Sequence, residues 1–218
     1  MSSVAVEAAP AATLSGDAAA PAQADRYRVG GPPPRPRSQL VGTGFAVAAC
    51  AMAVAGALGH YMARRHAAQE VVAHHEWLAG HVVPNPQLVY ALITLLVSVV
   101  TAHWAHWASC RDERGHAWVG MAITLVMGFA FFNMVMFSLN RMEVELGSGE
   151  WANLAFAVTG LALAILIVGM FYLGLVTLRS LGGSVGQRRS TPLGGAVFFW
   201  DFAVLAWAAT WYAVYVVK

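Results

Sequence analysis

The chain has 218 residues, of which 58% are hydrophobic and only 11% are charged. A soluble domain of this length usually carries about 25% charged residues, so this chain has too little polar surface to cover a globule in water. The net charge is +2, and no basic patch interleaved with aromatic residues occurs, which excludes nucleic acid as a partner. The composition predicts a protein that folds in a lipid bilayer.

Residues 1–38 differ in composition from the rest of the chain. They are rich in Ala, Pro, Ser and Gly and contain no continuous apolar run. Such a segment cannot bury enough apolar surface to offset the entropy cost of ordering it. We therefore expect a disordered N-terminal tail over 1–38, or alternatively an arm that docks on a partner complex, followed by a membrane domain over 39–218.

The membrane domain contains five apolar segments that are long enough to span a bilayer. A spanning helix needs about 20 mostly apolar residues. The hydrocarbon core offers no water, so each segment must form its backbone hydrogen bonds within a helix. The predicted fold class is an all-α integral membrane protein, a bundle of five transmembrane helices. The expected spans are 39–63, 87–109, 117–139, 151–178 and 193–217.

Basic residues are divided unequally between the two ends of these spans. Nine of them fall on one side and four on the other, and cytoplasmic loops carry the excess of Lys and Arg. This distribution predicts a cytoplasmic N-terminus and a C-terminus outside. The first side holds Arg26, Arg28, Arg35, Arg37, Arg111, Arg114, Arg179, Arg188 and Arg189, and the second holds Arg64, Arg65, Arg141 and Lys218.

The second span ends in TAHWAHWASC, residues 101–110, with two histidines and two tryptophans close together. Trp104 and Trp107 are typical of an aromatic belt at the membrane boundary, where the ring is apolar and the N–H group is hydrated. His103 and His106 are three residues apart and share a helix face, so a metal or haem site is the alternative. The small number of other histidines at this depth favours the belt.

The loop between the first two spans, EVVAHHEWLAGH, is the other candidate for a metal site. Glu70, His74, His75 and His81 could together bind copper or zinc. A short loop dense in His and Glu is more often a solvated surface, and the spacing matches no known site. We expect no metal or cofactor bound by this chain, with this loop as the alternative.

Asp201 is the one acid inside a span, in GGAVFFWDFAVLAW. Intramembrane carboxylates are costly and usually face a partner or a cavity, and His103, His106 or Asn133 could be that partner. The functional interpretation is a proton-accessible polar patch. The structural alternative is a hydrogen bond between helices or a contact with a neighbouring subunit. No catalytic motif occurs, so the sequence leaves open whether the chain itself is an enzyme.

The second and third spans read NPQLVYALITLLVSVVTAHWA and HAWVGMAITLVMGFAFF around a charged turn, and the chain ends VFFWDFAVLAWAATWYAVYVVK. In this order the segments resemble subunit III of the haem-copper (cytochrome c or quinol) oxidases, in a divergent short form with five helices. Trp200 and Trp207 fall at the family's usual tryptophan positions, and we expect both to be anchors at the membrane interface or against lipid. Cys50 falls where the family carries a buried glutamate, and Asp201 where it commonly has a histidine.

The resemblance implies an accessory, non-catalytic subunit of an O2-reducing, proton-translocating oxidase in the bacterial plasma (inner) membrane. It implies oxidase subunits I and II as partners, with haem and copper bound by those partners and phospholipid bound by this chain. The implied role is to stabilise the catalytic subunit and to support proton uptake. The alternative from a different class is a metal-binding or structural subunit of a copper-dependent membrane enzyme.

Overall fold

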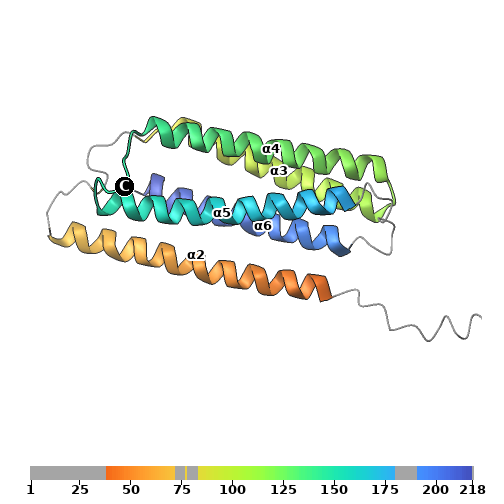
Figure 1. Ribbon diagram of the computed structural model, residues 1–218, viewed down its shortest axis with the longest axis horizontal. Coiled ribbons are helices and arrows are strands. Elements are labelled where there is room, and N and C mark those ends of the chain that lie inside the picture. The colour runs from red at the N-terminus through yellow and green to blue at the C-terminus, as the bar shows by residue number, and fades with distance from the viewer. Residues whose placement is uncertain (1–37, 72–76, 78–82, 180–190, 218) are drawn as a thin grey trace, which may run out of the picture. The chain divides into compact units, whose positions relative to one another are not determined.

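The computed structural model describes residues 38–71, 77, 83–179 and 191–217. These residues form five long helices and a short π-helical end, and no strand occurs among them (Figure 1). All five helices are long and apolar enough to cross a membrane, so the predicted all-α fold class is confirmed. The predicted N-terminal tail lies outside the described residues, apart from Ser38, which begins the first helix.

The first helix, α2, differs most from its predicted span, because it continues past residue 63 to Val71. Hydropathy marks only the apolar part of a helix, and the polar residues that follow include no proline or glycine to stop it. Proline in the first turn starts two later helices, at Pro86 and Pro192. The elements are α2 (Ser38–Val71), α3 (Asn85–Cys110), α4 (Arg114–Arg141), α5 (Glu150–Arg179), α6 (Thr191–Trp211) and the π-helix η4 (Tyr212–Val216).

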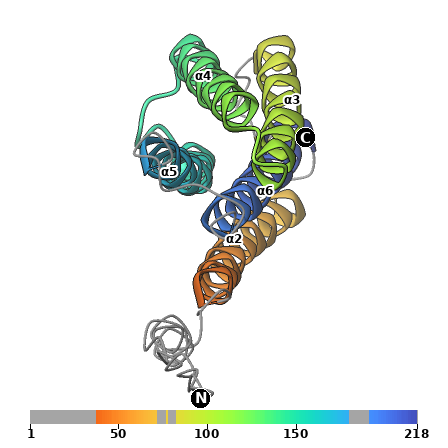
Figure 2. The ribbon, with the colours of Figure 1, turned by 90° about the vertical axis from the view of Figure 1, so that its right-hand side faces the viewer.

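Helix α6 lies between its neighbours and contacts α2, α3 and α5 (Figure 2). In its most apolar 18-residue stretch 61% of the residues are buried, whereas the corresponding figure for α2 is 11%. Helix α4 packs mainly on α3 and also contacts α5. The last helix in the sequence is therefore the one around which the others are assembled.

Helices α3 and α4 form a close antiparallel pair. The turn between them contains Asp112 in a left-handed conformation, with φ of 63°. The backbones then approach so closely that a Cβ atom on Gly120 would lie 2.9 Å from the Cβ of Ala105. One helix turn away from this contact, the hydroxyls of Thr101 and Thr124 are 2.8 Å apart. This packing fixes the end of α3 that carries the histidines and tryptophans.

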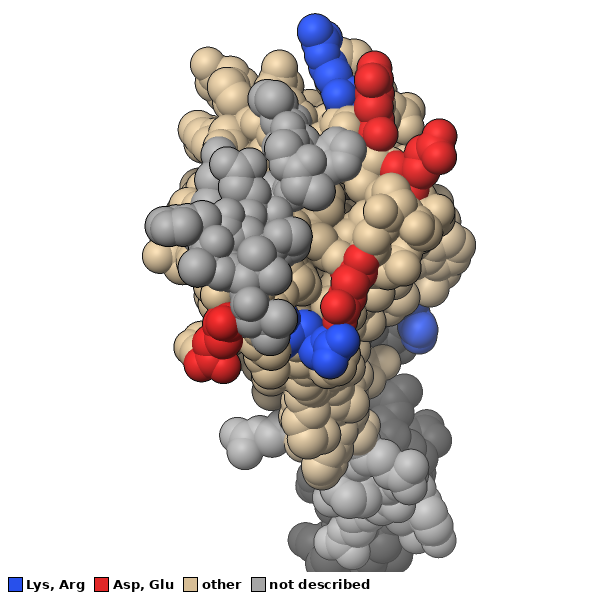
Figure 3. All heavy atoms as spheres, turned by 90° about the vertical axis from the view of Figure 1, so that its left-hand side faces the viewer, with Lys and Arg blue, Asp and Glu red and all other residues tan. Residues whose placement is uncertain are grey.

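Consecutive helices alternate in direction, so charged residues gather at two ends of the bundle (Figure 1). Figure 3 shows the end where α2 and α4 finish and α5 begins, with acidic and basic side chains together. At this end Arg64 forms an ion pair with Glu150. The described basic residues fall into the two groups expected from the sequence, and the side that faces the cytoplasm stays a prediction. Arg64, Arg65 and Arg141 lie at this end, and Arg111, Arg114 and Arg179 at the other.

Candidate functional site

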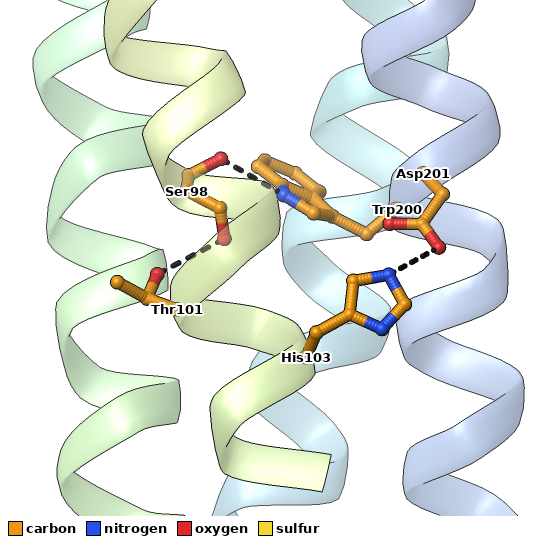
Figure 4. Close-up of polar contacts among 5 residues, drawn as sticks. All are labelled: Ser98, Thr101, His103, Trp200 and Asp201. Carbon is orange, nitrogen blue, oxygen red and sulfur yellow. Dashed lines mark hydrogen bonds and ion pairs between the residues drawn. The ribbon is translucent and has the colours of Figure 1, made fainter. Parts of the chain in front are cut away.

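Trp200 of α6 is the side chain that joins most of the bundle. Its ring is 0% exposed, and its indole Nε1 donates a hydrogen bond of 3.0 Å to the Oγ of Ser98 on α3 (Figure 4). A Cβ atom added at Gly128 of α4 or at Gly169 of α5 would lie 3.2 Å from this ring. Two glycines therefore form a notch that the indole fills, and one residue holds four helices together.

The next residue, Asp201, points to the outer side of the same helix. Its Oδ2 atom lies 2.9 Å from Nε2 of His103 on α3 (Figure 4). His103 is therefore the partner of Asp201 among the three that the sequence suggested. Asn133 lies on the exposed face of α4. The imidazole N–H donates and the carboxylate accepts, which gives a charge-assisted contact between α3 and α6.

His106 lies one turn beyond His103 and faces the start of α6. A Cβ atom on Gly194 would be 3.1 Å from Cε1 of His106, so the ring fits against a position that only glycine leaves open. Nε2 of His106 lies 4.0 Å from Sγ of Cys110 on the same helix. His103, His106 and Asp201 thus share one seam between α3 and α6, while only His103 and Asp201 bond directly.

The polar pair lies well inside the apolar part of the bundle. Asp201 is near the middle of the span Pro192–Val216, about 5 Å from its centre at the helical rise of 1.5 Å per residue. A hydrocarbon core of about 30 Å would enclose it. The side chains of His103 and Asp201 are nevertheless 55% and 32% exposed on the surface of the bundle. A hydrogen-bonded imidazole and carboxylate in such a place can exchange a proton.

The two tryptophans at the end of α3 face outward. Trp104 lies 6.1 Å from the ring of His116, and the guanidinium of Arg111 lies 3.7 Å above the ring of Trp107. Exposed aromatic rings beside charged groups at a helix end have the arrangement of an aromatic belt. The anchoring role of Trp104 and Trp107 at the interface stays a prediction.

The expectation that Trp200 and Trp207 face lipid is wrong. Both are 0% exposed, and Trp207 packs edge-on against Phe131 of α4 with ring centroids 5.0 Å apart. The physical reason is the central place of α6, which leaves neither ring a surface toward lipid. A tryptophan within a span has the same local sequence signal whether it lies at a membrane boundary or between helices.

The candidate metal loop is described only in part. Glu70 lies at the end of α2, where its carboxylate is 3.4 Å from Nδ1 of His66. His74, His75 and His81 lie outside the described residues. In the described ranges no three His, Cys, Asp or Glu side chains come close enough to hold a metal ion together. Metal binding by this loop stays a prediction.

The sequence reasoning did not find Ser98, Gly128 and Gly169, although they hold Trp200 in place. A glycine within an apolar span is a signal of close helix packing. That signal is not selective here, because Gly160 of α5 has nothing within 4 Å of the position of a Cβ atom.

A groove between α4 and α5 is the other feature of the surface. It has a volume of about 450 Å³ and is almost entirely apolar. Phe129 and Phe132 line it from α4, and Ile167, Phe171 and Leu175 from α5. Its lining is suited to a flexible hydrocarbon chain rather than to a polar ligand.

These features define a multi-pass helical membrane protein with an intramembrane pair of ionisable side chains, His103 and Asp201. The family model described as cytochrome c oxidase subunit III matches residues 80–218, which include helices α3 to α6. The chain belongs to the cytochrome c oxidase subunit III family. The resemblance noted in the sequence is thereby confirmed, and a multi-pass membrane protein of the respiratory chain follows from it.

Curated relatives agree with a divergent member of this family. Cytochrome c oxidase subunit 3 of Tetraodon nigroviridis is 26% identical over 142 residues, covering 64% of this chain and 54% of that protein. The corresponding protein of Carassius auratus is 25% identical over 121 residues, or 56% and 46% of the two chains. That of Struthio camelus is 25% identical over 133 residues, or 60% and 51%. The chain spans about half the length of these curated relatives.

Proposed function

We propose that this chain is an accessory, non-catalytic subunit III of a respiratory haem-copper oxidase. The observation that carries the proposal is the family match over residues 80–218. In this proposal haem and copper belong to partner subunits I and II, and this chain stabilises the catalytic subunit. We place it in the bacterial plasma (inner) membrane because of its resemblance to the short form, with the N-terminus in the cytoplasm because of its arginines.

The stabilising role has support in the way α6 is held. Trp200 fills the notch between Gly128 and Gly169 and bonds to Ser98, so four helices meet at one ring. Close-packed interiors transmit strain rather than absorb it. A bundle assembled in this way can act as a firm support for a larger membrane subunit.

The groove between α4 and α5 supports lipid binding. Its apolar lining, with Phe129 and Phe171 on its two sides, would hold the acyl chain of a phospholipid. Lipid held there would fill the space between two helices that contact each other less than α4 contacts α3. Delipidation of the complex is then expected to loosen α4 against α5.

The pair of His103 and Asp201 is the group through which this chain would support proton uptake. Asp201→Asn keeps a side chain that can bond to His103 but removes the exchangeable carboxylate. We expect the variant complex to assemble and to start turnover normally, and then to lose activity sooner. Asn133→Ala, a change at a polar residue elsewhere in the spans, is the control. Equal turnover lifetimes for wild type and Asp201→Asn would contradict a role of this pair in proton uptake.

Deletion of this chain tests the accessory function itself. The expected result is an oxidase that retains its haem spectrum and its initial rate but inactivates faster during turnover, with the loss restored by the full chain. Immediate loss of all O2 reduction with the haem spectrum intact would contradict a non-catalytic role. An unchanged oxidase lifetime would contradict a role in the oxidase.

A further inference from the structure

The His103–Asp201 pair lies on the outer surface of the bundle, not in an internal cavity. Leu205, one turn further along α6, is 69% exposed, and Phe198, one turn before Asp201, is 46% exposed. Phe198, Asp201 and Leu205 form a stripe along α6, on its side between α3 and α2 (Figure 2). The stripe is apolar at both ends and ionisable in the middle.

This surface is a poor boundary with lipid. A carboxylate and an imidazole at the depth of Asp201 are costly to leave against hydrocarbon, and ionisable residues in spans almost always face protein or water. The hydrogen bond between the two side chains leaves the Nδ1 edge of the imidazole open. Oδ1 of Asp201 is buried without a hydrogen-bond partner among the described residues, so the exposed polar edge is that of His103, whose side chain is 55% exposed. This edge needs a cover that hydrocarbon cannot provide.

The unused hydrogen-bonding capacity shows what kind of cover fits. With Nε2–H of His103 donated to Asp201, Nδ1 is an acceptor that points away from the pair (Figure 4). No second hydrogen bond to His103 occurs among the described residues. The free ring nitrogen of His103, beside the Asp201 carboxylate, favours a hydrogen-bond donor, supplied by a hydroxyl, an amide or a cation.

The opposite face of the bundle lacks these properties. Phe129 and Phe171, on the two sides of the groove between α4 and α5, are 66% and 71% exposed. The lining of that groove contains no ionisable side chain. Lipid can cover this groove without leaving an ionisable group unsatisfied, although Asn133, one turn from Phe129, is exposed on the same helix. The groove and the His103–Asp201 surface are therefore predicted to have different neighbours.

We infer that the face of α3 and α6 that carries His103 and Asp201 binds a transmembrane helix of the catalytic, haem-bearing subunit, and that this helix presents a hydrogen-bond donor at the level of His103. The identity of the partner rests on the proposed function. The position of the contact and the chemistry of the partner's side chain rest on the exposed polar pair.

Photo-crosslinking in the intact complex tests this inference. p-Benzoylphenylalanine is placed at Leu205 in the full chain, or at Phe129 as the control position. After irradiation in native membranes and purification in mild detergent, the adducts are identified by mass spectrometry. We expect Leu205 to join a peptide from a transmembrane helix of the haem-bearing subunit, with a donor side chain within about one turn of the site. We expect Phe129 to join phospholipid.

Three results would overturn the inference: only lipid adducts at Leu205, a protein adduct at Phe129 in place of one at Leu205, or a second copy of this chain joined at Leu205. If haem co-purifies but Leu205 joins only lipid, the interface is wrong while the proposed function stands. If Leu205 joins a donor-bearing membrane helix of a complex without haem, the proposed function fails and the named partner fails with it.

A double variant gives an independent measurement of the same contact. His103→Leu with Asp201→Leu removes the polar groups and keeps an apolar surface, so the bundle is expected to fold, as circular dichroism would verify. Hydrogen bonds between membrane helices change an association by about threefold to tenfold. We expect the double variant to retain about threefold to tenfold less catalytic subunit on purification than wild type. Asn133→Leu should retain the wild-type amount. Full retention by the folded double variant would contradict the interface.

Discussion

Helices α6 and α2 are both long and apolar, yet α6 lies at the centre of the bundle and α2 is mostly exposed. In the most apolar 18-residue stretch of α6, 61% of the residues are buried, against 11% in that of α2. The outward side of α2 carries small exposed residues, among them Ala46, Ala49, Ala53 and Gly56. The comparison shows that apolar composition selects the bilayer as solvent, whereas steric fit to neighbouring helices decides which helix becomes the centre.

The same contrast occurs between adjacent residues within α6. Trp200 is enclosed by α3, α4 and α5, while Asp201 is on the surface and bonds only to His103. A helix turns by about 100° per residue, so neighbours in sequence face different surroundings. Changes on the enclosed side of α6 should therefore affect the fold, and changes on its open side should affect association.

The largest expected effect is that of Trp200→Ala. Removing a fully buried tryptophan leaves a cavity beside Ser98, whose hydroxyl keeps only its bond to the carbonyl of Leu95, and typically costs about 3–5 kcal/mol of unfolding free energy. Leu205→Ala, on the exposed side of the same helix, should stay within about 0.5 kcal/mol. Unfolding of the purified chain in detergent measures both, and equal losses would contradict the central place of Trp200.

A smaller effect is expected from filling the notch around the same ring. Gly169→Val forces atoms into a space that the indole occupies, and overpacking costs about 1–3 kcal/mol. Gly160→Val changes the same helix at a position with nothing within 4 Å. Thermal unfolding of the two variants should separate them, and a similar melting temperature for both would show that the notch tolerates a side chain.

Ser98→Ala removes the acceptor of the indole N–H. A buried donor left without its partner costs about 1–3 kcal/mol, so the variant should be less stable by an amount in that range. Ser138→Ala is the matched control, since the Ser138 hydroxyl bonds only to the carbonyl of Met134 in its own helix. In the background of Trp200→Ala the Ser98 change should cost no more than Ser138→Ala, since it then removes only the bond to the Leu95 carbonyl. Additive losses in the double variant would argue against the hydrogen bond.

The smallest effects are expected on α2. Ala53→Leu enlarges an exposed residue and should change unfolding stability by less than about 0.5 kcal/mol. Val54→Ala, the next residue, removes buried apolar surface and should cost about 1 kcal/mol. A larger loss for Ala53→Leu than for Val54→Ala in the isolated chain would reverse the faces assigned to this helix.

Some of this architecture is predictable from the sequence, for identifiable physical reasons. The five helices follow from runs of apolar residues that only a helix can satisfy in lipid. A polar partner for Asp201 follows from the cost of a carboxylate in a span, but the sequence left His103, His106 and Asn133 open and the structure pairs it with His103. In contrast, Trp200 and Trp107 both lie within predicted spans but are buried and exposed, respectively. Their places depend on neighbours that are distant in the chain.

The glycines give the same lesson about packing. Gly169 and Gly160 lie in one apolar helix, and only the first meets a ring from another helix. The contact is decided by the rotation and depth of α6 relative to α5, which no local pattern encodes. The length of α2 was also missed, because its last turns are polar and hydropathy does not detect them.

Purification of the tagged full chain in a gentle detergent, with visible spectra and metal analysis of the product, tests the central claim most directly. The account predicts that a large oxidase subunit co-purifies with haem absorbance, and that this chain contains neither haem nor copper after a harsher detergent separates it. The chain alone, or together with copper and without haem, would contradict its assignment as an accessory oxidase subunit.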